Sequence, residues 1–328
     1  MRVVALEPEL FDTWIAWQTL IRMGFGVPNG RFISNYPEKG EDLRGWCGRV
    51  RDVVRAAKKA GKIGPVKANT ITSELEAVRK LKLVDPPVEA TFSGDEWIEN
   101  AVREQSDEDL WDAVITRNHS IVASRIYRYD ELDFNDPGLA TDARIIPRRK
   151  SEIVQFAKCF LGASNKVHFV DPYFFPTDIA FNEPLCDLLE AAFEGRDVLR
   201  CTYHCSAKRI SKPAAFQREL EVALGEGWIK IPAGGHLFIV LWADHGRADP
   251  MHARYILSDR GGLKYDYGLG EDDGKTTDVN YLEERQWVDR LKGYSPSGRE
   301  SEILGAWHID EDGTLSSARP RRDRFEKE

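Results

Sequence analysis

The chain has 328 residues, of which 42% are hydrophobic and 30% charged, and its formal net charge is −8. This composition predicts a soluble, cytoplasmic globular protein of about two domains, and no run approaches the roughly 18 consecutive apolar residues that a membrane helix needs. The acidic balance argues against a broad basic surface for tight non-specific DNA binding. Its five cysteines are scattered, which is typical of free thiols in a reducing compartment and excludes a disulfide scaffold.

The first 138 residues are expected to form a mainly α-helical domain. Apolar side chains recur at helical spacing in segments 10–21, 43–57 and 71–83, and again from residue 97 to 102. Residues 27–34 form a turn that leads into an extended piece, and 110–122 is a further apolar stretch. The tryptophans of this region, Trp14, Trp17, Trp46, Trp97 and Trp111, are expected in the core, with a base-stacking platform as the alternative.

A polar, turn-prone stretch at residues 133–138 marks a domain boundary. Residues 139–316 then show helices at 153–161, 185–193 and 213–224, and strands at 166–170, 198–204, 228–231, 237–242 and 263–267. This order predicts an α/β domain in which helices flank a mixed β-sheet. Residues 317–328 form a basic tail that is expected to be disordered.

The most informative motif lies at residues 251–262, where a strand-forming segment carries His252, Arg254 and Asp259 as H-x-R-x-x-x-x-D. Side chains alternate along a strand, so His252 and Arg254 would point the same way, roughly 7 Å apart. An imidazole beside a permanent positive charge is suited to attack on a phosphodiester, and a carboxylate at Asp259 could orient either group. The alternative is an edge strand with an incidental histidine and arginine.

Four further residues are candidate substrate-binding groups. Asp171 and Tyr173 follow the strand at 166–170, where functional groups often lie; alternatively, Asp171 caps the turn that follows it. His204 and Lys208 are candidate contributors to a phosphate site. Cys201, His204 and Cys205 do not have a zinc-knuckle spacing, so we expect no metal and no cofactor.

The motif resembles the signature of the phospholipase D superfamily, H-x-K-x-x-x-x-D followed by a Gly-rich segment that 268–271 matches here. The resemblance implies a phospholipase-D-like half unit and a metal-independent phosphodiesterase. By this resemblance His252 would be the nucleophile that forms a phosphohistidine, or its acid/base partner, and Arg254 would hold phosphate oxygens. Asp259 would be the carboxylate that orients the imidazole or the cation. Arg254 replaces the family's lysine, which keeps the charge and improves bidentate phosphate contact. Glu271, expected to line the substrate site, stands where the family usually has a neutral polar residue.

Phospholipase-D-like catalysis uses two histidines, one to attack and one to protonate the leaving oxygen. This chain has one motif, and single-motif members of the superfamily form homodimers with the active site on the two-fold axis. We therefore expect a homodimeric nuclease acting on DNA or RNA, with phage defence and further subunits of a defence complex as a plausible setting. The alternatives are an inactive nucleic-acid-binding or scaffold subunit, and a metal-dependent nuclease that uses Asp171.

Overall fold

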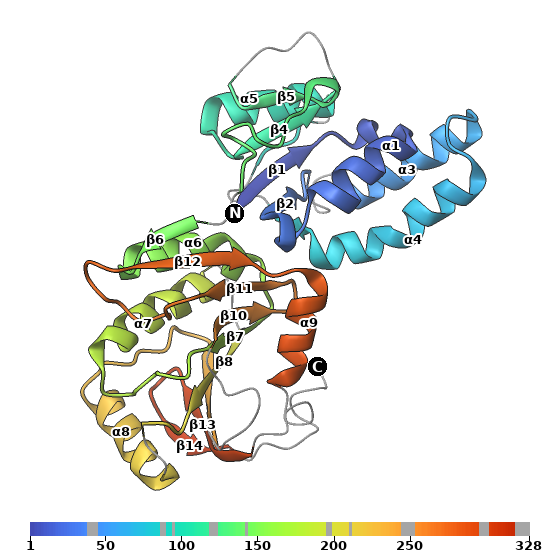
Figure 1. The fold of residues 1–328 in the computed structure, drawn as a ribbon. Coiled ribbons are helices and arrows are strands. Elements are labelled where there is room, and N and C mark those ends of the chain that lie inside the picture. The colour runs from blue at the N-terminus through green and yellow to red at the C-terminus, as the bar shows by residue number, and fades with distance from the viewer. Residues whose placement is uncertain are drawn as a thin grey trace. The chain divides into compact units, whose positions relative to one another are not determined.

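The structure is a computed structural model that describes residues 1–37, 45–85, 90–93, 96–117, 124–141, 144–194, 199–209, 212–243, 253–294 and 302–318. The chain divides into two compact units, Met1–Asp142 and Ala143–Glu328, which are drawn in Figure 1. From the sequence we placed this boundary after residue 138. The tail predicted at 317–328 lies outside the described residues from position 319 onward. None of the described helices is long and apolar enough to cross a membrane.

The N-terminal unit is built on a five-stranded sheet whose strands are all parallel, in the order β3-β2-β1-β4-β5. These strands are β1 (Arg2–Leu6), β2 (Arg31–Ser34), β3 (Leu83–Val84), β4 (Ala113–Thr116) and β5 (Ile126–Arg128). Between them run α1 (Trp14–Ala16), the π-helical turn η2 (Trp17–Gly24), α3 (Gly45–Lys59), α4 (Pro65–Leu81) and α5 (Trp97–Glu108). Short 3-10 turns precede α1 and β2, at η1 (Pro8–Asp12) and η3 (Val27–Asn29), and η4 (Tyr129–Glu131) follows β5.

The prediction of a mainly helical N-terminal domain is wrong, because this unit is an α/β unit with a central parallel sheet. Alternate residues of β1 enter different cores. Val4 and Leu6 pack with the side chains of η2, α3 and α4, whereas Ala5 packs with those of α5. A strand that is covered on both faces has no polar side to alternate with the apolar one, so its sequence lacks the pattern that marks a half-exposed strand.

The tryptophans of this unit are core residues, as predicted. Trp17, Trp46, Trp97 and Trp111 are buried, and Trp14 packs against the core while remaining partly exposed. Hydrogen bonds also satisfy the indole nitrogens of the buried ones; Trp46, for example, donates to the carbonyl of Leu6 at 2.8 Å. These rings therefore do not form a base-stacking surface.

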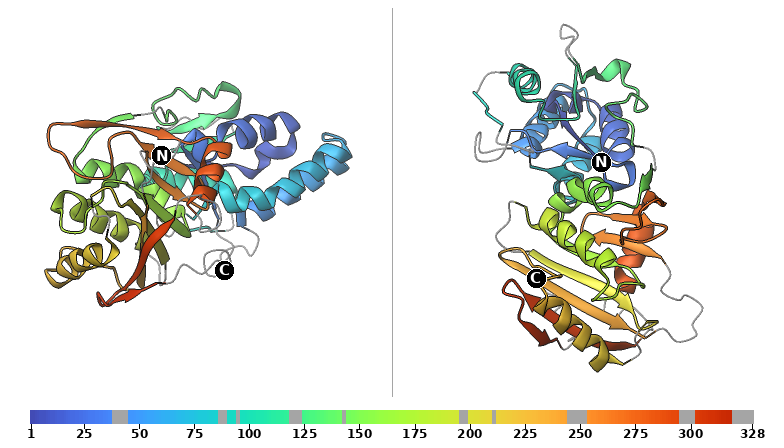
Figure 2. Two further views of the ribbon diagram at one scale, coloured as in Figure 1. Left: turned by 60° about the horizontal axis from the view of Figure 1, so that its bottom comes forward. Right: turned by 90° about the vertical axis from the view of Figure 1, so that its left-hand side faces the viewer.

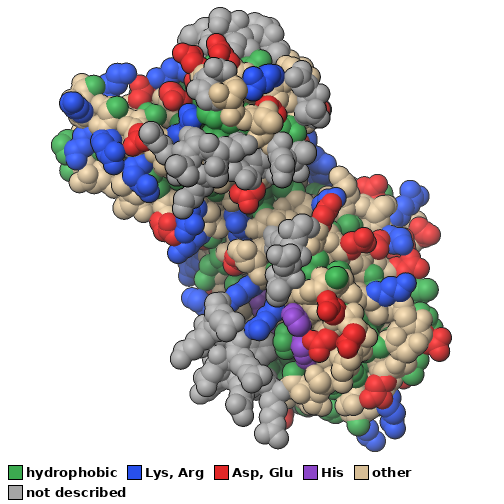
Figure 3. Space-filling model, turned by 180° about the vertical axis from the view of Figure 1, so that it is seen from behind, with side chains coloured by type: hydrophobic (Ala, Val, Ile, Leu, Met, Phe, Trp, Pro, Cys, Tyr) green, Lys and Arg blue, Asp and Glu red, His purple; other side chains and the backbone are tan. Residues whose placement is uncertain are grey.

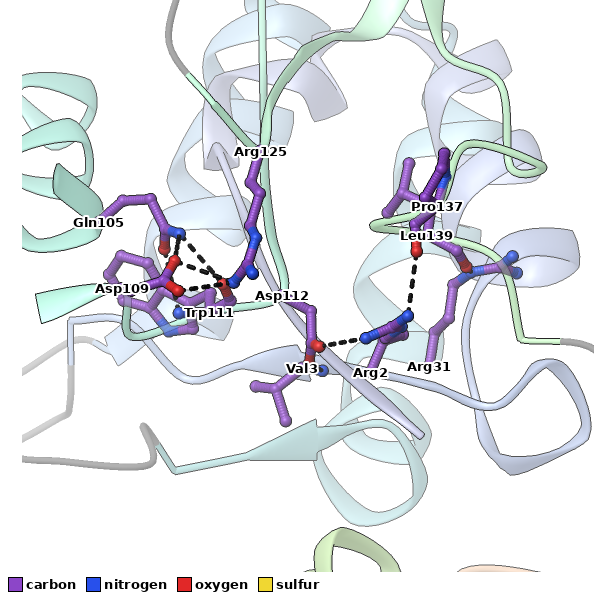
Figure 4. A network of polar contacts seen from close by, with 10 residues as sticks. All are labelled: Arg2, Val3, Arg31, Gln105, Asp109, Trp111, Asp112, Arg125, Pro137 and Leu139. Carbon is purple, nitrogen blue, oxygen red and sulfur yellow. Dashed lines mark hydrogen bonds and ion pairs between the residues drawn. The ribbon is translucent and has the colours of Figure 1, made fainter. Parts of the chain in front are cut away.

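Arginines at the start of the sheet tie the last segment of the N-terminal unit back to its first strands (Figure 4). Arg2 donates to Asp112 at 2.8 Å and to the carbonyl of Pro137 at 3.0 Å. Arg31, which is buried, donates to the carbonyl of Leu139 at 2.7 Å. The segment that follows β5 thereby belongs to the N-terminal unit.

The C-terminal unit contains a nine-stranded mixed sheet in the order β14-β13-β9-β8-β7-β10-β11-β12-β6. Its strands are β6 (Arg144–Pro147), β7 (Lys166–Val170), β8 (Leu199–Ser206), β9 (Gly235–Trp242), β10 (Arg254–Ser258), β11 (Gly262–Tyr265), β12 (Thr276–Tyr281), β13 (Ile303–Asp310) and β14 (Leu315–Ser317). The three strands β7, β8 and β9 are parallel, and the remaining neighbours are antiparallel. The mixed sheet predicted for this half is present, although segment 228–231 is not a strand.

Helices cover both faces of the mixed sheet. In Figures 1 and 2, α6 (Lys150–Ala163), α7 (Ile179–Phe193) and α8 (Pro213–Gly225) lie on one face and α9 (Glu284–Gly293) lies on the other. On the α9 face, Trp287 packs with Val170, Val240 and Tyr255 from three strands. On the opposite face, Phe216 of α8 stacks on Trp307 of β13 with ring centroids 5.2 Å apart. Apolar side chains thus cover both faces of the sheet.

Candidate functional site

Four of the predicted site residues, Asp171, Tyr173, Lys208 and Arg254, meet at one edge of the mixed sheet. Asp171 directly follows β7, and Lys208 comes two residues after β8. Arg254 begins β10, which is antiparallel to β7 with Tyr255 opposite Val170. The first residue of β10 therefore lies beside the last residues of β7. The carboxyl edge of parallel strands is where open α/β sheets commonly bind ligands.

Asp171 is a buried residue that connects two backbone segments of this edge. Its side chain is fully buried and accepts hydrogen bonds from the backbone N–H groups of Tyr173 and Leu269, both at 2.9 Å. Burial raises the pKa of this carboxyl group, and the two N–H donors together with the nearby Arg254 and Arg148 oppose that rise. Asp171 thus joins the turn after β7 to the loop between β11 and β12. This agrees with the turn-capping alternative and adds a second loop to it.

Arg254 is held with its guanidinium group over an aromatic ring. Its Cζ lies 4.6 Å from the centroid of the Tyr173 ring, a geometry for cation–π attraction, and its Nη1 donates to the carbonyl of Asp266 at 2.9 Å. The Nε of Arg254 is buried and has no hydrogen-bond partner among the described residues. The Nζ of Lys208 lies 5.8 Å from the same ring. Two cations therefore lie near the Tyr173 ring, and one of them, Arg254, has a donor with no partner among the described residues.

Arg148, which the sequence analysis did not single out, and the Gly-rich segment after β11 complete the edge. Arg148 donates from Nη1 to Asp272 at 3.0 Å and from Nη2 to the carbonyl of Gly270 at 2.9 Å. Gly268 has a φ of +106°, and a Cβ at this position would lie 3.1 Å from Oδ2 of Asp171. Glycine is required where the backbone passes this close to a carboxylate at positive φ. The Arg148-Arg149-Lys150 run after β6 was the available sequence signal for the extra cation.

Asp259 and Glu271 have other partners. Asp259 lies beyond the far end of β10, where it accepts hydrogen bonds from the backbone N–H and the side-chain amide of Asn165 at 2.9 and 3.0 Å. Five residues along a strand separate it from Arg254 by roughly 16 Å. Glu271 accepts a hydrogen bond from the backbone N–H of Lys150 at 3.2 Å, at the start of α6. The structure thus does not bring Asp259 to Arg254, and it directs the Glu271 carboxylate toward a helix N-terminus.

His204 lies on the face of the mixed sheet that α9 covers. The indole N–H of Trp242 donates to Nδ1 of His204 at 3.1 Å, and Nε2 of His204 lies 3.0 Å from Nδ1 of His168. Because an indole can only donate, a neutral His204 carries its proton on Nε2 and donates it to His168. Burial lowers the pKa of His168 to about 4. His204 is therefore part of a buried polar chain.

The three residues considered as zinc ligands from the sequence do not all point to the same face of β8. Cys201 and Cys205 are buried and occupy odd positions of β8, whereas His204 occupies an even one, so the thiols and the imidazole point to opposite faces. The Cys205 thiol lies 3.5 Å from the carbonyl oxygen of Val240, and burial raises its pKa. These three residues do not converge on one point.

The predicted nucleophile, His252, lies outside the described residues. No protein-family model matches the chain, and no curated protein matches it significantly. The arguments on function therefore rest on the residues of this chain alone.

The carboxyl edge of the N-terminal sheet also gathers polar groups, but those groups are paired with one another. Glu7 follows β1 and accepts hydrogen bonds from the Thr116 hydroxyl at 2.7 Å and from the Arg117 backbone N–H at 2.6 Å. The Arg117 guanidinium group binds Asp12 at 2.6 Å, which lowers the pKa of that carboxyl group and outweighs its partial burial. The edge formed by Asp171, Tyr173, Lys208 and Arg254 (the Arg254 edge) is the stronger candidate, because the Nε of Arg254 is a buried donor with no hydrogen-bond partner among the described residues.

Proposed function

We propose that the protein is a metal-independent phosphodiesterase, most plausibly a nuclease, that holds a substrate phosphate at the Arg254 edge. The observation that carries the proposal is the guanidinium group of Arg254, fixed between Tyr173 and the carbonyl of Asp266 with its Nε unsatisfied. An unsatisfied buried donor costs free energy, and a phosphate oxygen is a strong acceptor for arginine. Lys208, whose Nζ lies 5.8 Å from the centroid of the Tyr173 ring, supplies a second positive charge.

The chemistry proposed for this edge is nucleophilic catalysis by His252, which precedes Arg254 by two residues in the sequence. A ring nitrogen of His252 forms a bond to phosphorus as the ester P–O bond breaks, and a second histidine gives the leaving oxygen its proton. Water then breaks the P–N bond and restores the imidazole. Arg254 stabilises the charge that builds up on the phosphoryl oxygens in both steps.

The second histidine is proposed to come from a second copy of the chain. No other histidine of the sequence is followed by a cation and a carboxylate at this spacing. A two-fold homodimer supplies each residue twice around one axis, so the His252 side chains of two protomers would share one scissile phosphate. Nucleic acid is the proposed substrate, gripped locally by a few cations, since the chain as a whole carries a net charge of −8.

The test is cleavage of labelled single- and double-stranded DNA and RNA by the full-length protein in EDTA. We expect cutting by the wild type, none by His252→Ala, and a rate at least about 100-fold lower for Arg254→Ala, the usual cost of removing a transition-state donor. Arg254→Lys keeps the charge and should retain part of the activity. Arg260→Lys, two residues beyond the opposite end of β10, is the matched control and should cut like the wild type.

Three outcomes would contradict the proposal. Undiminished cutting by His252→Ala would exclude the nucleophile, and complete loss of cutting in EDTA would point to a metal-dependent nuclease. Binding of nucleic acid by the wild type without cutting would favour the inactive binding subunit. Light scattering of the purified protein tests the dimer, and a strictly monomeric, active protein would exclude the shared site.

A further inference from the structure

A second set of polar side chains lies at the opposite, amino edge of the parallel strands. His236 is near the start of β9, and His308 and Asp310 are near the end of β13. The two strands are antiparallel neighbours, with Asp310 opposite His236 and His308 opposite Phe238. Positions 308 and 310 are two apart on one strand, so both side chains point to the face that His236 shares. Figure 3 shows histidine side chains beside acidic ones on the surface of this unit.

The three side chains converge on one point. Nδ1 of His236 lies 3.2 Å from Nε2 of His308 and 3.1 Å from Oδ1 of Asp310. Nε2 of His308 lies 3.3 Å from the same Oδ1. The three ligand atoms therefore form a nearly equilateral triangle. In a tetrahedral zinc site with bonds of about 2.0 Å, neighbouring ligand atoms are about 3.3 Å apart.

We propose that His236, His308 and Asp310 bind a divalent first-row transition metal ion, best Zn²⁺, with three protein ligands. Two imidazoles and one carboxylate suit such an ion, whereas Mg²⁺ and Ca²⁺ prefer sites made only of oxygen. The side chains of His236, His308 and Asp310 are 36%, 22% and 38% exposed, so a fourth position faces solvent. Within the described part of the chain, this is the one group of three histidine, cysteine or acidic residues that converges in this way.

Hydrogen bonding alone explains this arrangement less well than a cation does. Two protonated ring nitrogens could each donate to Oδ1 of Asp310, but the His236–His308 contact would then bring two N–H groups together. A cation at the centre of the triangle satisfies all three atoms at once. The ring of Phe238 stacks on His308 with centroids 4.5 Å apart and holds that imidazole in place. All three ligands also sit on paired strands, which fix their positions better than loops do.

This site is separate from the Arg254 edge. His236 aligns through β8 and β7 with Lys166, which accompanies Asp259 at the far end of β10. The metal site therefore lies at the other end of the strands from Arg254, roughly 16 Å away along the strand direction alone. Removal of the metal should leave phosphodiester cutting unchanged, so the two proposals fail independently.

The experiment measures metal uptake by the full-length protein after EDTA treatment and buffer exchange. We expect one equivalent of bound Zn²⁺ by elemental analysis and a rise in the melting temperature on zinc addition, because only the folded state has the site. When Co²⁺ is added in place of Zn²⁺, we expect visible absorption without the thiolate-to-cobalt band that cysteine ligation would give. His308→Ala and Asp310→Asn should each weaken zinc binding by at least about 100-fold. Asp310→Asn keeps the side-chain shape and so guards against misfolding as the cause.

Asp312→Asn is the matched control, since Asp312 lies in the turn between β13 and β14, two residues after Asp310, and accepts a hydrogen bond from the Thr314 N–H at 2.8 Å. It should bind zinc like the wild type. The proposal is overturned if the wild type takes up no zinc, if the melting temperature does not respond, or if Asp310→Asn and His308→Ala bind as tightly as the wild type. A strong thiolate-to-cobalt band would assign the uptake to the cysteines and would equally overturn it.

Discussion

The hydrogen-bonded pair of the partly buried His168 and the buried His204 makes a quantitative prediction about stability and pH. His168 titrates at about 4 in the folded protein and near 6.5 in the unfolded chain. Burial is the main cause of the lowered pKa, the positive charge of Lys166 acts in the same direction, and the charge of Asp259 opposes both. Between these two pKa values the unfolded chain binds a proton that the folded protein does not. Stability is therefore fully present above about pH 6.5 and falls as the pH drops toward 4.

The size of the effect follows from the two pKa values. The complete transition is worth about 3 kcal/mol, and the part between about pH 7.5 and pH 5 is worth about 2 kcal/mol. His168→Asn removes the titrating group while keeping an acceptor near the position of Nδ1. Over this range the free energy of unfolding of the wild type should thus fall by about 2 kcal/mol more than that of the variant.

Urea unfolding followed by tryptophan fluorescence at the two pH values measures this difference. Thr202→Val is the control, because Thr202 lies opposite His168 on β8 and its loss removes no titrating group. It should shift the unfolding free energy by the same amount at both pH values. Equal pH dependence in the wild type and His168→Asn would refute the reasoning, and would mean that His168 is solvated in the folded protein.

Three other changes test separate features. Gly268→Ala and Gly274→Ala both place an alanine at positive φ, which should cost about 1–3 kcal/mol each; Gly268→Ala should cost more, because its Cβ would also lie 3.1 Å from a carboxylate oxygen whereas no atom lies within 4 Å at Gly274, and urea unfolding measures both. The Cys205 thiol is buried with a raised pKa, so Ellman's reagent should label it only after unfolding, and rapid labelling of the native protein would contradict its burial. Asp259→Ala removes hydrogen bonds to the start of β7 and should lower the unfolding free energy by about 1 kcal/mol without slowing cleavage; a loss of activity in a stably folded variant would return Asp259 to the catalytic machinery.

The sequence was most informative in the C-terminal unit. The helices predicted at 153–161 and 213–224 lie within α6 and α8, and the strand predicted at 166–170 matches β7. In the N-terminal unit the strands are short and covered on both faces, so segment 2–6 lacked a recognisable pattern. There the helical spacing of the tryptophans was correctly interpreted as core, while the sheet that this core covers was missed.

Long-range pairing explains what the sequence could not show about the sites. The meeting of Arg254 and Asp171 depends on β10 returning antiparallel beside β7. The meeting of His236 with His308 depends on β13 pairing with β9 across 72 residues. The sequence shows the local pattern His308-Ile309-Asp310, but residue spacing alone does not predict which strand pairs with it. Arg148 was missed for the same reason, since its contacts come from the loop after β11.

The parity of residue spacing decides which residues of one strand can act together. Residues two apart share a face and lie about 7 Å from each other, whereas residues five apart lie on opposite faces and at opposite ends of a short strand. Arg254 and Asp259 are five apart, and the structure gives them separate partners at the two ends of β10. His308 and Asp310 are two apart, and they meet at one point. A motif on a strand is therefore best interpreted through its even spacings, and a carboxylate at an odd spacing is expected to stabilise the neighbouring strand instead of the chemistry.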